Sequence, residues 1–530
     1  MSAVEAPTIL QRRIVIAAAL CVAAFALVGV RLIDVTLLKG GGDAAHKPAR
    51  ALLSRADIVD RNGQLLARDL PVHDVYAHPA AFSDRAQAAH ALAQVIGASE
   101  PRLLHMFESK HPYVLVARQI SPDVQDRVMS LGLPGIEFPR SQKRFYPEGS
   151  AAAQVIGVTD SDGHGLSGIE RGLDAELRAN THPVQLSLDM RVQYALAHEL
   201  ALSKTEFSAK AAGGIVIDVR TGEIIAMASL PDFDPNARNF DKESGRNRMA
   251  QDTYELGSVF KIFTFAMANE DHTTRMDELF PVGSGFKLGR YTIHDAEHMP
   301  AFMAARDILA QSSNAGTAQI ALRSGADRQR AFLANLGLLA PVHAEVSESR
   351  TPSIPLHWGD IETATIGFGH GIAVTPLAFV TAASIVVNGG RKITPTFLKH
   401  PEDSRAEQLI KPATSAAMRD LLRYVVTDGT GRNANVEGYN VGGKTGSAQE
   451  VGSNGRYIEH QLLTSFCGVF PIDNPRYLVF VMLDEPHGTK ATFGLALAGH
   501  TAAPLAGAVI ARIAPILGMP RAVADAGNSP

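Results

Sequence analysis

The feature that most constrains this chain is a serine at the start of a predicted buried helix. Ser258 follows Gly257, and an apolar run rich in Phe and Ile continues to Phe265. Lys261 lies three residues after Ser258, so a helix places both side chains on one face. Burial disfavours the charged form of a lysine, and a neutral lysine can accept the proton of a serine hydroxyl. The stretch therefore predicts a serine nucleophile with a lysine base.

The Ser-x-x-Lys spacing alone is weak evidence, because the chain carries it twice. Ser284 and Lys287 have the same spacing, but they lie among glycines and show no helical period. We interpret this second pair as part of a loop.

Two later tripeptides favour Ser258 over Ser284. The first is Ser-x-Asn, with Ser312 and Asn314, and the second is Lys-Thr-Gly, residues 444–446. Each tripeptide alone is more typical of a turn or a solvated loop. All three motifs in this order form the motif set of penicillin-binding proteins and serine β-lactamases.

Length and composition limit the alternatives. A chain of 530 residues is too long for one ordinary core, so two or more domains are expected. The net charge of −4 gives no basic surface for nucleic acid.

Cys21 and Cys467 lie far apart, and we expect no disulfide; so few cysteines do not decide the redox compartment. No Cys/His spacing typical of a metal site occurs, and we interpret His370 and His500 as local hydrogen-bonding residues.

The N-terminal region predicts a membrane anchor at residues 14–38. After Arg12 and Arg13, the 17 residues from Ile14 to Val30 carry no charge, which is near the lower limit for a transmembrane helix. Arg31 interrupts the run and can extend its side chain to the interface. A signal peptide is the alternative, although no small-x-small cleavage pattern closes the run. The distribution of basic residues does not settle the orientation. Residues 1–13 are a short tail and 39–54 a linker.

Residues 55–180 resemble the non-catalytic pedestal, or dimerisation-type, domain of class B penicillin-binding proteins. The resemblance rests on the segment Arg55–Gly63, with Ala56 where glycine is usual, and on residues 144–149 and 165–170. This region brings no nucleophile and base together, so we interpret its charged residues as structural.

Residues 181–518 predict a second domain of α+β class, an antiparallel sheet covered by helices. Residues 214–228 and 465–482 read as β-hairpins, and residues 440–449 add a strand with Lys444. The hairpins are separated by stretches of helical pattern, and a last helix precedes a polar tail at residues 519–530. The predicted helices are 258–269, 303–323, 376–388, 412–426 and 501–517.

Taken together, residues 55–510 are similar to the FtsI type of class B penicillin-binding protein, the septal peptidoglycan D,D-transpeptidases. Residues 367–377 and 429–431 match further family stretches, while Leu256 replaces a common proline and Ser447 a common threonine. The resemblance implies a single-pass protein of the bacterial inner membrane at the division septum, with its catalytic domain in the periplasm. Implied partners are stem peptides ending in D-Ala-D-Ala, β-lactams, a SEDS-type glycosyltransferase and other division proteins. No cofactor is implied.

The resemblance also implies a role for each motif residue. Ser258 attacks the carbonyl between the two D-alanines and Lys261 accepts its proton. Ser312 passes a proton to the departing D-Ala nitrogen. The remaining implied site residues are Asn314, which holds Lys261 and the substrate amide, Lys444 and Thr445, which face the substrate carboxylate, and Gly446 and Ser447, whose strand binds the substrate. The backbone N–H groups of Ser258 and Ser447 form the implied oxyanion hole.

Three alternatives share parts of this evidence. A serine β-lactamase has the same motif set, but no Glu-x-x-Leu-Asn is present for deacylation, and the pedestal favours a transpeptidase. An elongation-specific class B protein differs only in where it works. A catalytically silent division scaffold would not need the complete motif set.

Overall fold

The computed structural model describes residues 9–33, 54–237, 241–399, 402, 405–451 and 457–521. The chain forms two units, residues 1–53 and residues 54–530. The predicted linker at 39–54, except its last residue, lies outside the described part, as do residues 1–8 of the predicted tail and residues 522–530.

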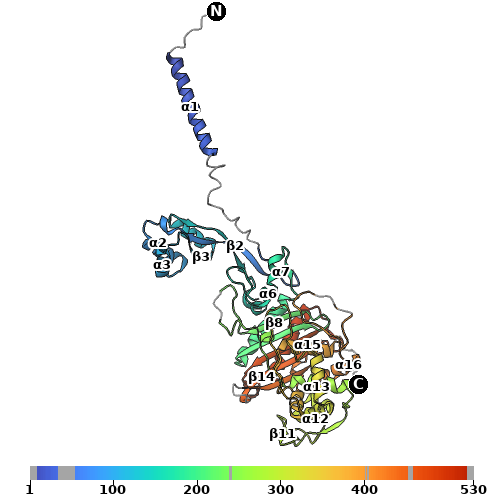
Figure 1. Cartoon of the computed structure of the whole chain (residues 1–530). Coiled ribbons are helices and arrows are strands. Elements are labelled where there is room, and N and C mark those ends of the chain that lie inside the picture. The colour runs from blue at the N-terminus through green and yellow to red at the C-terminus, as the bar shows by residue number, and fades with distance from the viewer. Residues whose placement is uncertain are drawn as a thin grey trace, which may run out of the picture. The chain divides into compact units, whose positions relative to one another are not determined.

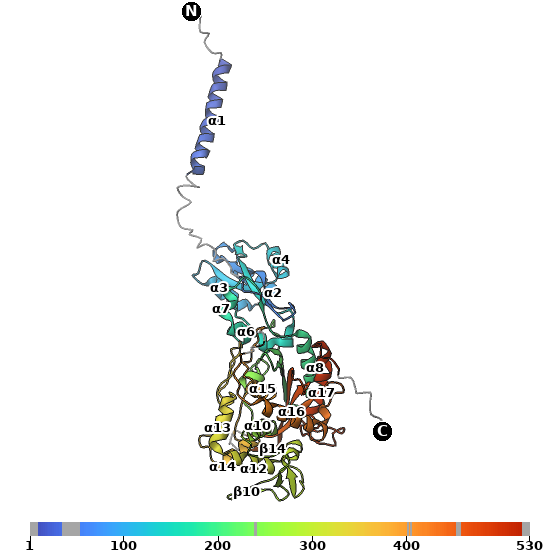
Figure 2. The same cartoon turned by 90° about the vertical axis from the view of Figure 1, so that its right-hand side faces the viewer.

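The N-terminal unit contains one described helix, α1 (Ile9–Ile33), drawn in blue in Figures 1 and 2. It coincides with most of the anchor predicted at residues 14–38, but residues 34–38 are outside the described part. Among the helices formed by described residues, none is both long enough and apolar enough to cross a membrane. That part of the prediction is therefore not confirmed.

The pedestal is built around one long strand, β2 (Leu65–Ala77). It pairs with β1 (Ile58–Val59), β3 (Val114–Ile120), β4 (Ile136–Glu137) and β5 (Arg140–Phe145), all antiparallel. The apolar faces of α2 (Arg85–Ile96), α3 (Glu100–Glu108) and α4 (Pro122–Ser130) form a separate small core with β2 and β3. Helix α2 is capped at its N-terminus by Asp84, whose carboxylate accepts from two backbone N–H groups, and at its C-terminus by Gly97 in the left-handed conformation.

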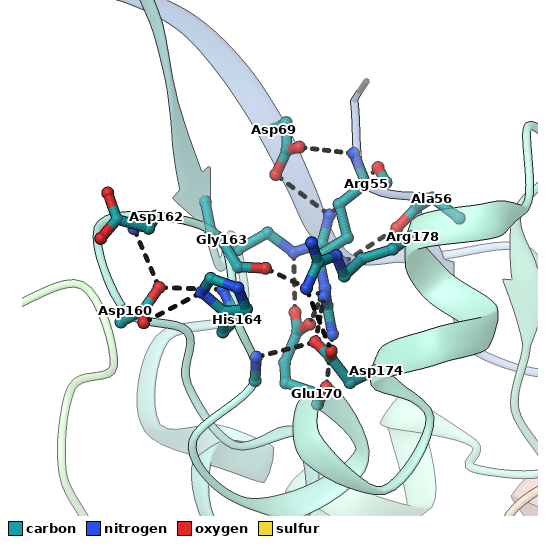
Figure 3. Close-up of polar contacts among 12 residues, drawn as sticks. Arg55, Ala56, Asp69, Asp160, Asp162, Gly163, His164, Glu170, Asp174 and Arg178 are labelled. Carbon is teal, nitrogen blue, oxygen red and sulfur yellow. Dashed lines mark hydrogen bonds and ion pairs between the residues drawn. The ribbon is translucent and has the colours of Figure 1, made fainter. Parts of the chain in front are cut away.

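A buried ion cluster closes the pedestal where it meets α6 (Gly168–Gly172) and α7 (Asp174–Ala179), as Figure 3 shows. Glu170 is fully buried and accepts from Arg55 Nε at 2.5 Å and from Arg144 Nε at 2.7 Å. Asp174 accepts from Arg55 at 2.6 Å, and Asp69 lies 3.3 Å from Arg144. Each buried guanidinium therefore faces carboxylates, as buried charges require. The residues form no nucleophile–base pair, consistent with their predicted structural role.

The C-terminal domain contains a five-stranded antiparallel sheet in the order β13-β14-β15-β7-β8. Its strands are β7 (Ala211–Asp218), β8 (Ile224–Leu230), β13 (Gly442–Val451), β14 (Tyr457–Phe470) and β15 (Tyr477–Asp484). Both predicted hairpins are present. Along β15, Leu478, Phe480 and Met482 join one core while Val479 and Val481 join another, so the sheet is covered on both faces. This is the predicted α+β arrangement.

Different helices cover the two faces. Helices α8 (Met190–Glu206) and α17 (Ala502–Ile516) pack on one face. Helices α10 (Lys261–Glu270), α15 (Pro376–Val387) and α16 (Pro412–Thr427) form the core on the other. Short β6 (Val184–Gln185) pairs with β1 in parallel and joins the domain to the pedestal.

One predicted helix is wrong. The stretch 303–323 does not run as a single helix: β12 (Phe302–Ala304) precedes α11 (Ala305–Ala310), and α12 (Asn314–Ser324) starts anew. The break occurs at Ser312, whose φ of 63° lies in the left-handed region that interrupts a right-handed helix. Ser313 then caps α12 through its hydroxyl, which accepts from the N–H of Gly316 at 3.0 Å. An apolar pattern did not reveal this break.

Candidate active site

The predicted nucleophile lies on a tight turn before α10. Residues Gly257–Phe260 form a 3-10 turn, η4, and Lys261 begins the helix. Gly257 has a φ of +59°, and a Cβ there would lie 2.7 Å from the carbonyl oxygen of Ser447. Only glycine allows so close an approach in this conformation. The sequence Gly-Ser thus brings the backbone at Ser258 against strand β13.

Ser312 lies in the break between α11 and α12, and both predicted lysines reach it. Lys261 Nζ donates to the Ser312 carbonyl at 2.5 Å and lies 3.2 Å from its Oγ. Lys444 Nζ lies 3.0 Å from the same Oγ. Asn314 Oδ1 accepts from Lys261 at 2.8 Å. The structure therefore brings together four predicted residues from three separate segments.

Strand β13 at the sheet edge supplies the rest of the predicted set. Thr445 Oγ1 lies 3.3 Å from Lys444 Nζ, and Ser447 Oγ accepts from the N–H of Ala498 at 3.0 Å. A Cβ at Gly446 would lie 2.7 Å from the carbonyl oxygen of Leu256, so this glycine lets the strand pass close to the nucleophile turn.

A cavity of about 410 Å³ lies over these groups. The predicted residues that line it are Ser258, Ser312, Asn314, Thr445 and Ser447. Lys261 and Lys444 lie beneath it and are fully buried. Such a cavity is of the size that proteins use for small ligands.

The environment of the two lysines disfavours their charge. Burial lowers the pKa of Lys261 well below its usual range, and the nearby charge of Lys444 lowers it further, while Asp295 opposes the shift. Burial lowers the pKa of Lys444 to about 7. A lysine with such a pKa is a suitable general base near neutral pH.

Sequence reasoning missed Asp295. Its carboxylate accepts from Ser313 Oγ at 2.7 Å, from the N–H of Ala315 at 3.1 Å and from the N–H of Asn314. It thus satisfies the free N–H groups at the start of α12 and fixes the position of Asn314. No local pattern marks this residue, because its partners come about 20 positions later.

Thr430 is a second residue without a predicted role. Its hydroxyl lies 2.6 Å from that of Thr445 and it lines the cavity. The stretch Gly429–Gly431, which matches a family stretch, is the sequence signal that indicates it. His500, interpreted from sequence as a local hydrogen-bonding residue, also lines the cavity.

Glu255 forms polar contacts beside the nucleophile turn. This carboxylate accepts from the N–H of Gly371 and from the hydroxyl of Tyr457, both at 3.0 Å. The ring of His370 lies 5.5 Å from that of Tyr457. Burial lowers the pKa of His370 to about 4, so its ring is neutral, and within the described residues its buried Nδ1 has no hydrogen-bond partner. A hydrogen bond with the backbone of Phe368 opposes the shift in pKa, in line with the interpretation of His370 as a local hydrogen-bonding residue.

The second Ser-x-x-Lys lies outside the site. Lys287 belongs to β10 (Phe286–Leu288), which pairs with β11 (Tyr291–Ile293) in a small ribbon. The loop prediction is therefore wrong for Lys287, which the pairing with β11 holds in a strand. Ser284 and Lys287 are exposed and line no part of the cavity. In the described part of the chain, no three His, Cys, Asp or Glu side chains gather as a metal site would require.

The fold and the site together define a serine acyltransferase in which two buried lysines share one serine hydroxyl. Comparison with known families agrees with this class. The penicillin binding protein transpeptidase domain matches residues 212–511, and the penicillin-binding protein dimerisation domain matches residues 52–193. The chain belongs to the class B penicillin-binding proteins, the family of peptidoglycan D,D-transpeptidases.

Individual relatives point the same way. The probable peptidoglycan D,D-transpeptidase FtsI of Caulobacter vibrioides is 39% identical over 485 residues, covering 88% of this chain and 82% of the relative. The probable peptidoglycan D,D-transpeptidase PenA of Neisseria meningitidis is 31% identical over 497 residues, covering 87% and 85%. The crystal structure of penicillin binding protein 3 from Mycobacterium tuberculosis with ampicillin has a TM-score of 0.70 and 26% identity, covering 89% and 97%. The complex with aztreonam has a TM-score of 0.69.

Proposed function

We propose that this protein cross-links peptidoglycan stem peptides through an acyl-enzyme on Ser258. The observation that carries the proposal is the convergence of Lys261 and Lys444 on the Ser312 hydroxyl beneath the cavity that Ser258 lines. Because burial lowers the pKa of Lys261 well below its usual range, Lys261 can be neutral near physiological pH, which a base for a serine hydroxyl requires.

In the first half-reaction, Ser258 Oγ attacks the carbonyl between the two D-alanines and Lys261 takes its proton. Ser312, within 3.2 Å of Lys261 Nζ, then passes its proton to the leaving D-Ala nitrogen as the C–N bond breaks, and it receives the Ser258 proton from Lys261 in exchange. Lys261 and Ser312 therefore both end the step in their starting protonation states. Lys444 and Thr445 face the substrate carboxylate. Their spacing of 3.3 Å lets both contact one carboxylate group.

The backbone N–H groups of Ser258 and Ser447 act as the oxyanion hole in this proposal. Support comes from Gly257, which brings the two backbones together. Each such donor contributes about 3–4 kcal/mol to the transition state.

In the second half-reaction, an amine of another stem peptide attacks the acyl carbon. A C–N bond forms, the bond from carbon to Ser258 Oγ breaks, and the proton lost by the amine returns to Oγ through Lys261. The products are one cross-link and free enzyme, so no cofactor enters the balance.

The same chemistry makes the protein a target of β-lactams, since related structures hold aztreonam and ampicillin. Ser258→Ala should abolish labelling by a fluorescent penicillin and leave thermal unfolding close to that of the wild type. The matched control is Ser284→Ala, which has the same spacing to a lysine and should label normally. Labelling lost in the control and kept in Ser258→Ala would refute the assignment.

A transpeptidase should also hold its acyl group until an amine arrives. Excess penicillin should give a burst of about one equivalent of ring opening and a persistent increase in intact mass. Sustained turnover without a lasting adduct would identify a β-lactamase instead, and no burst at all would identify a silent scaffold.

We further propose that the enzyme works in cell division at the septum, since its FtsI relative is 39% identical. The partners in this setting are a SEDS-type glycosyltransferase and other division proteins. A fluorescent fusion should gather at midcell in dividing cells. A signal along the side walls would favour the elongation role.

We propose that the protein is located at the inner membrane with its catalytic domain in the periplasm; the uncharged run Ile14–Val30 supports the membrane location, and the proposed peptidoglycan substrate supports the periplasmic side. Full-length protein should stay with membranes after an alkaline wash. Release by the wash would refute an anchor at residues 14–38, and an N-terminus found near residue 39 would show a signal peptide.

A further inference from the structure

A second cavity, of about 330 Å³, lies beside the segment that leads to the nucleophile. We name it the arginine cavity after Arg246, Arg248 and Arg350, which line it together with Asp252, Tyr254 and Asp484. All residues that line it are polar or charged. It shares no residue with the cavity over Ser258.

The arginine cavity is on the same face of the sheet as the nucleophile turn. Side chains alternate along β15, and Phe480 and Met482 lie in the core that contains Val259, so Asp484 points to that face as well. Asp484 pairs with Leu463, which pairs with Ala448 next to Ser447. Two strand spacings separate these positions, or about 10 Å.

Two of the three arginines are already paired with carboxylates. Arg246 donates to Asp252 at 2.7 Å, and Arg248 donates to Glu243 at 2.9 Å and lies 3.7 Å from Asp252. Arg350 is exposed and forms no ion pair with the residues that the structure describes. Asp484, of which only 5% is exposed, likewise has no ion-pair partner there.

Hydrogen bonding is incomplete in the same place. The Oδ1 atom of Asp484 and the Nε atom of Arg248 are buried and have no hydrogen-bond partner among the described residues. Both side chains are more than nine-tenths buried. Buried polar groups without partners are rare in folded proteins, and two in one cavity call for an explanation.

We infer that the arginine cavity binds the acceptor stem peptide through a carboxylate and a neighbouring ammonium or amide N–H. Arg350 and Arg248 hold the carboxylate, and Asp484 accepts from the nitrogen. This inference rests on the proposed transpeptidation. The donor peptide fills the cavity over Ser258, so the second peptide needs a site outside it. A cavity about 10 Å away is within reach of an extended peptide of a few residues.

The test measures how acceptor concentration governs the fate of the acyl-enzyme. Wild-type protein, Asp484→Asn and Arg350→Gln are acylated with a thioester donor, and the acceptor is a synthetic stem peptide of about four residues, which is long enough to span about 10 Å. Both variants should raise the KM for this peptide at least tenfold while the rates of penicillin acylation and of hydrolysis stay within twofold. The control is Arg275→Gln, which breaks an exposed ion pair with Asp277 elsewhere and should change nothing. An unchanged KM in both cavity variants would overturn the inference.

A second measurement separates this inference from the proposed function. Binding to the Ser258→Ala protein is followed by calorimetry with D-alanine, with D-lactate, which lacks the ammonium, and with D-alaninamide, which lacks the carboxylate. D-alanine should bind at least tenfold more tightly than either analogue, and Asp484→Asn should remove the difference. Equal affinity for all three compounds would refute the site. Failure of the wild type to acylate would instead refute the proposed function and leave the binding result standing.

Discussion

The pedestal and the active site each bury two cationic side chains, but the groups that contact these side chains differ. In the pedestal, Arg55 and Arg144 share the carboxylate of Glu170 and each has a further carboxylate partner. In the active site, Lys261 and Lys444 meet at one neutral hydroxyl, and in the described part of the chain neither forms an ion pair. Burial lowers the pKa of both lysines, and the charge of Lys444 lowers the pKa of Lys261 further, whereas each buried arginine is held by carboxylates.

This difference distinguishes buried charges that suit a structural role from buried charges that suit catalysis. An arginine keeps its proton under all conditions and matches a carboxylate with two parallel N–H groups. A lysine loses its proton when buried, so it can act as a base. The two arginines therefore suit a structural cluster, and the two lysines suit a catalytic one. Four variants test this difference, from the largest expected effect to the smallest.

Lys261→Met should lower the rate of penicillin acylation about 10³-fold, because a positioned base contributes on this scale. Methionine keeps the length and apolar stem of the side chain, so the protein should still fold. The rate is measured by rapid mixing with a chromogenic β-lactam. Acylation within tenfold of the wild type would mean that another group takes the proton.

Arg144→Met should lower the free energy of unfolding by about 3–5 kcal/mol, because Glu170 and Asp69 stay buried and lose a partner. Folded molecules should still acylate at the wild-type rate. Thermal and urea unfolding measure the stability, and active-site titration counts the folded fraction. A variant as stable as the wild type would show that the cluster is not structural.

Lys444→Met should slow acylation about 10–100-fold, since it removes a charged hydrogen bond to the substrate carboxylate. Wild-type acylation should also fall as pH rises through about 7, when Lys444 loses its proton, and the variant should lack this decline.

Lys444→Met also tests how the burial of this lysine affects the stability of the fold. The folded pKa of Lys444 is lowered, so the unfolded state binds more protons, and wild-type stability should rise from about pH 7 towards the usual lysine pKa of about 10.4. Lys444→Met should weaken this rise and unfold at no lower temperature than the wild type at pH 7. A lower unfolding temperature at pH 7 would contradict the argument.

Arg275→Gln measures how much an exposed ion pair contributes to the free energy of unfolding. Arg275 lies 2.7 Å from Asp277, and both side chains are mostly exposed. Solvent screens such pairs, so unfolding should change by less than about 1 kcal/mol and acylation not at all. A larger change than that of Arg144→Met would reverse the comparison.

The sequence predicted the contents of the site better than its surroundings. The three motifs carried Ser258, Lys261, Ser312, Asn314 and Lys444, and their order favoured the Ser-x-x-Lys at 258–261, whose serine lines the cavity, over the pair at 284–287, which does not. The α+β class of the C-terminal domain also followed from the pattern of strands and helices, whereas the pedestal domain was predicted from its resemblance to a known family. These features are local, so adjacent residues reveal them.

What the sequence did not reveal depends on contacts between distant residues. The break at Ser312 is held by Asp295 and the two lysines, while the local apolar pattern favoured one long helix. The approach of Gly257 to Ser447 joins segments about 190 positions apart. Tertiary contacts overrode local preference in each case.

The glycines around Ser258 also limit how the protein can escape β-lactams by mutation. A Cβ at Gly369 would lie 2.1 Å from the carbonyl oxygen of Gly257, and a Cβ at Gly257 or Gly446 would lie 2.7 Å from a backbone carbonyl oxygen. A substitution at any of these positions should displace the turn that carries Ser258. Resistance substitutions should therefore arise elsewhere along the cavity, at Leu497 or His500, which line it outside the turn. A mutant population selected on ampicillin should leave all three glycines unchanged.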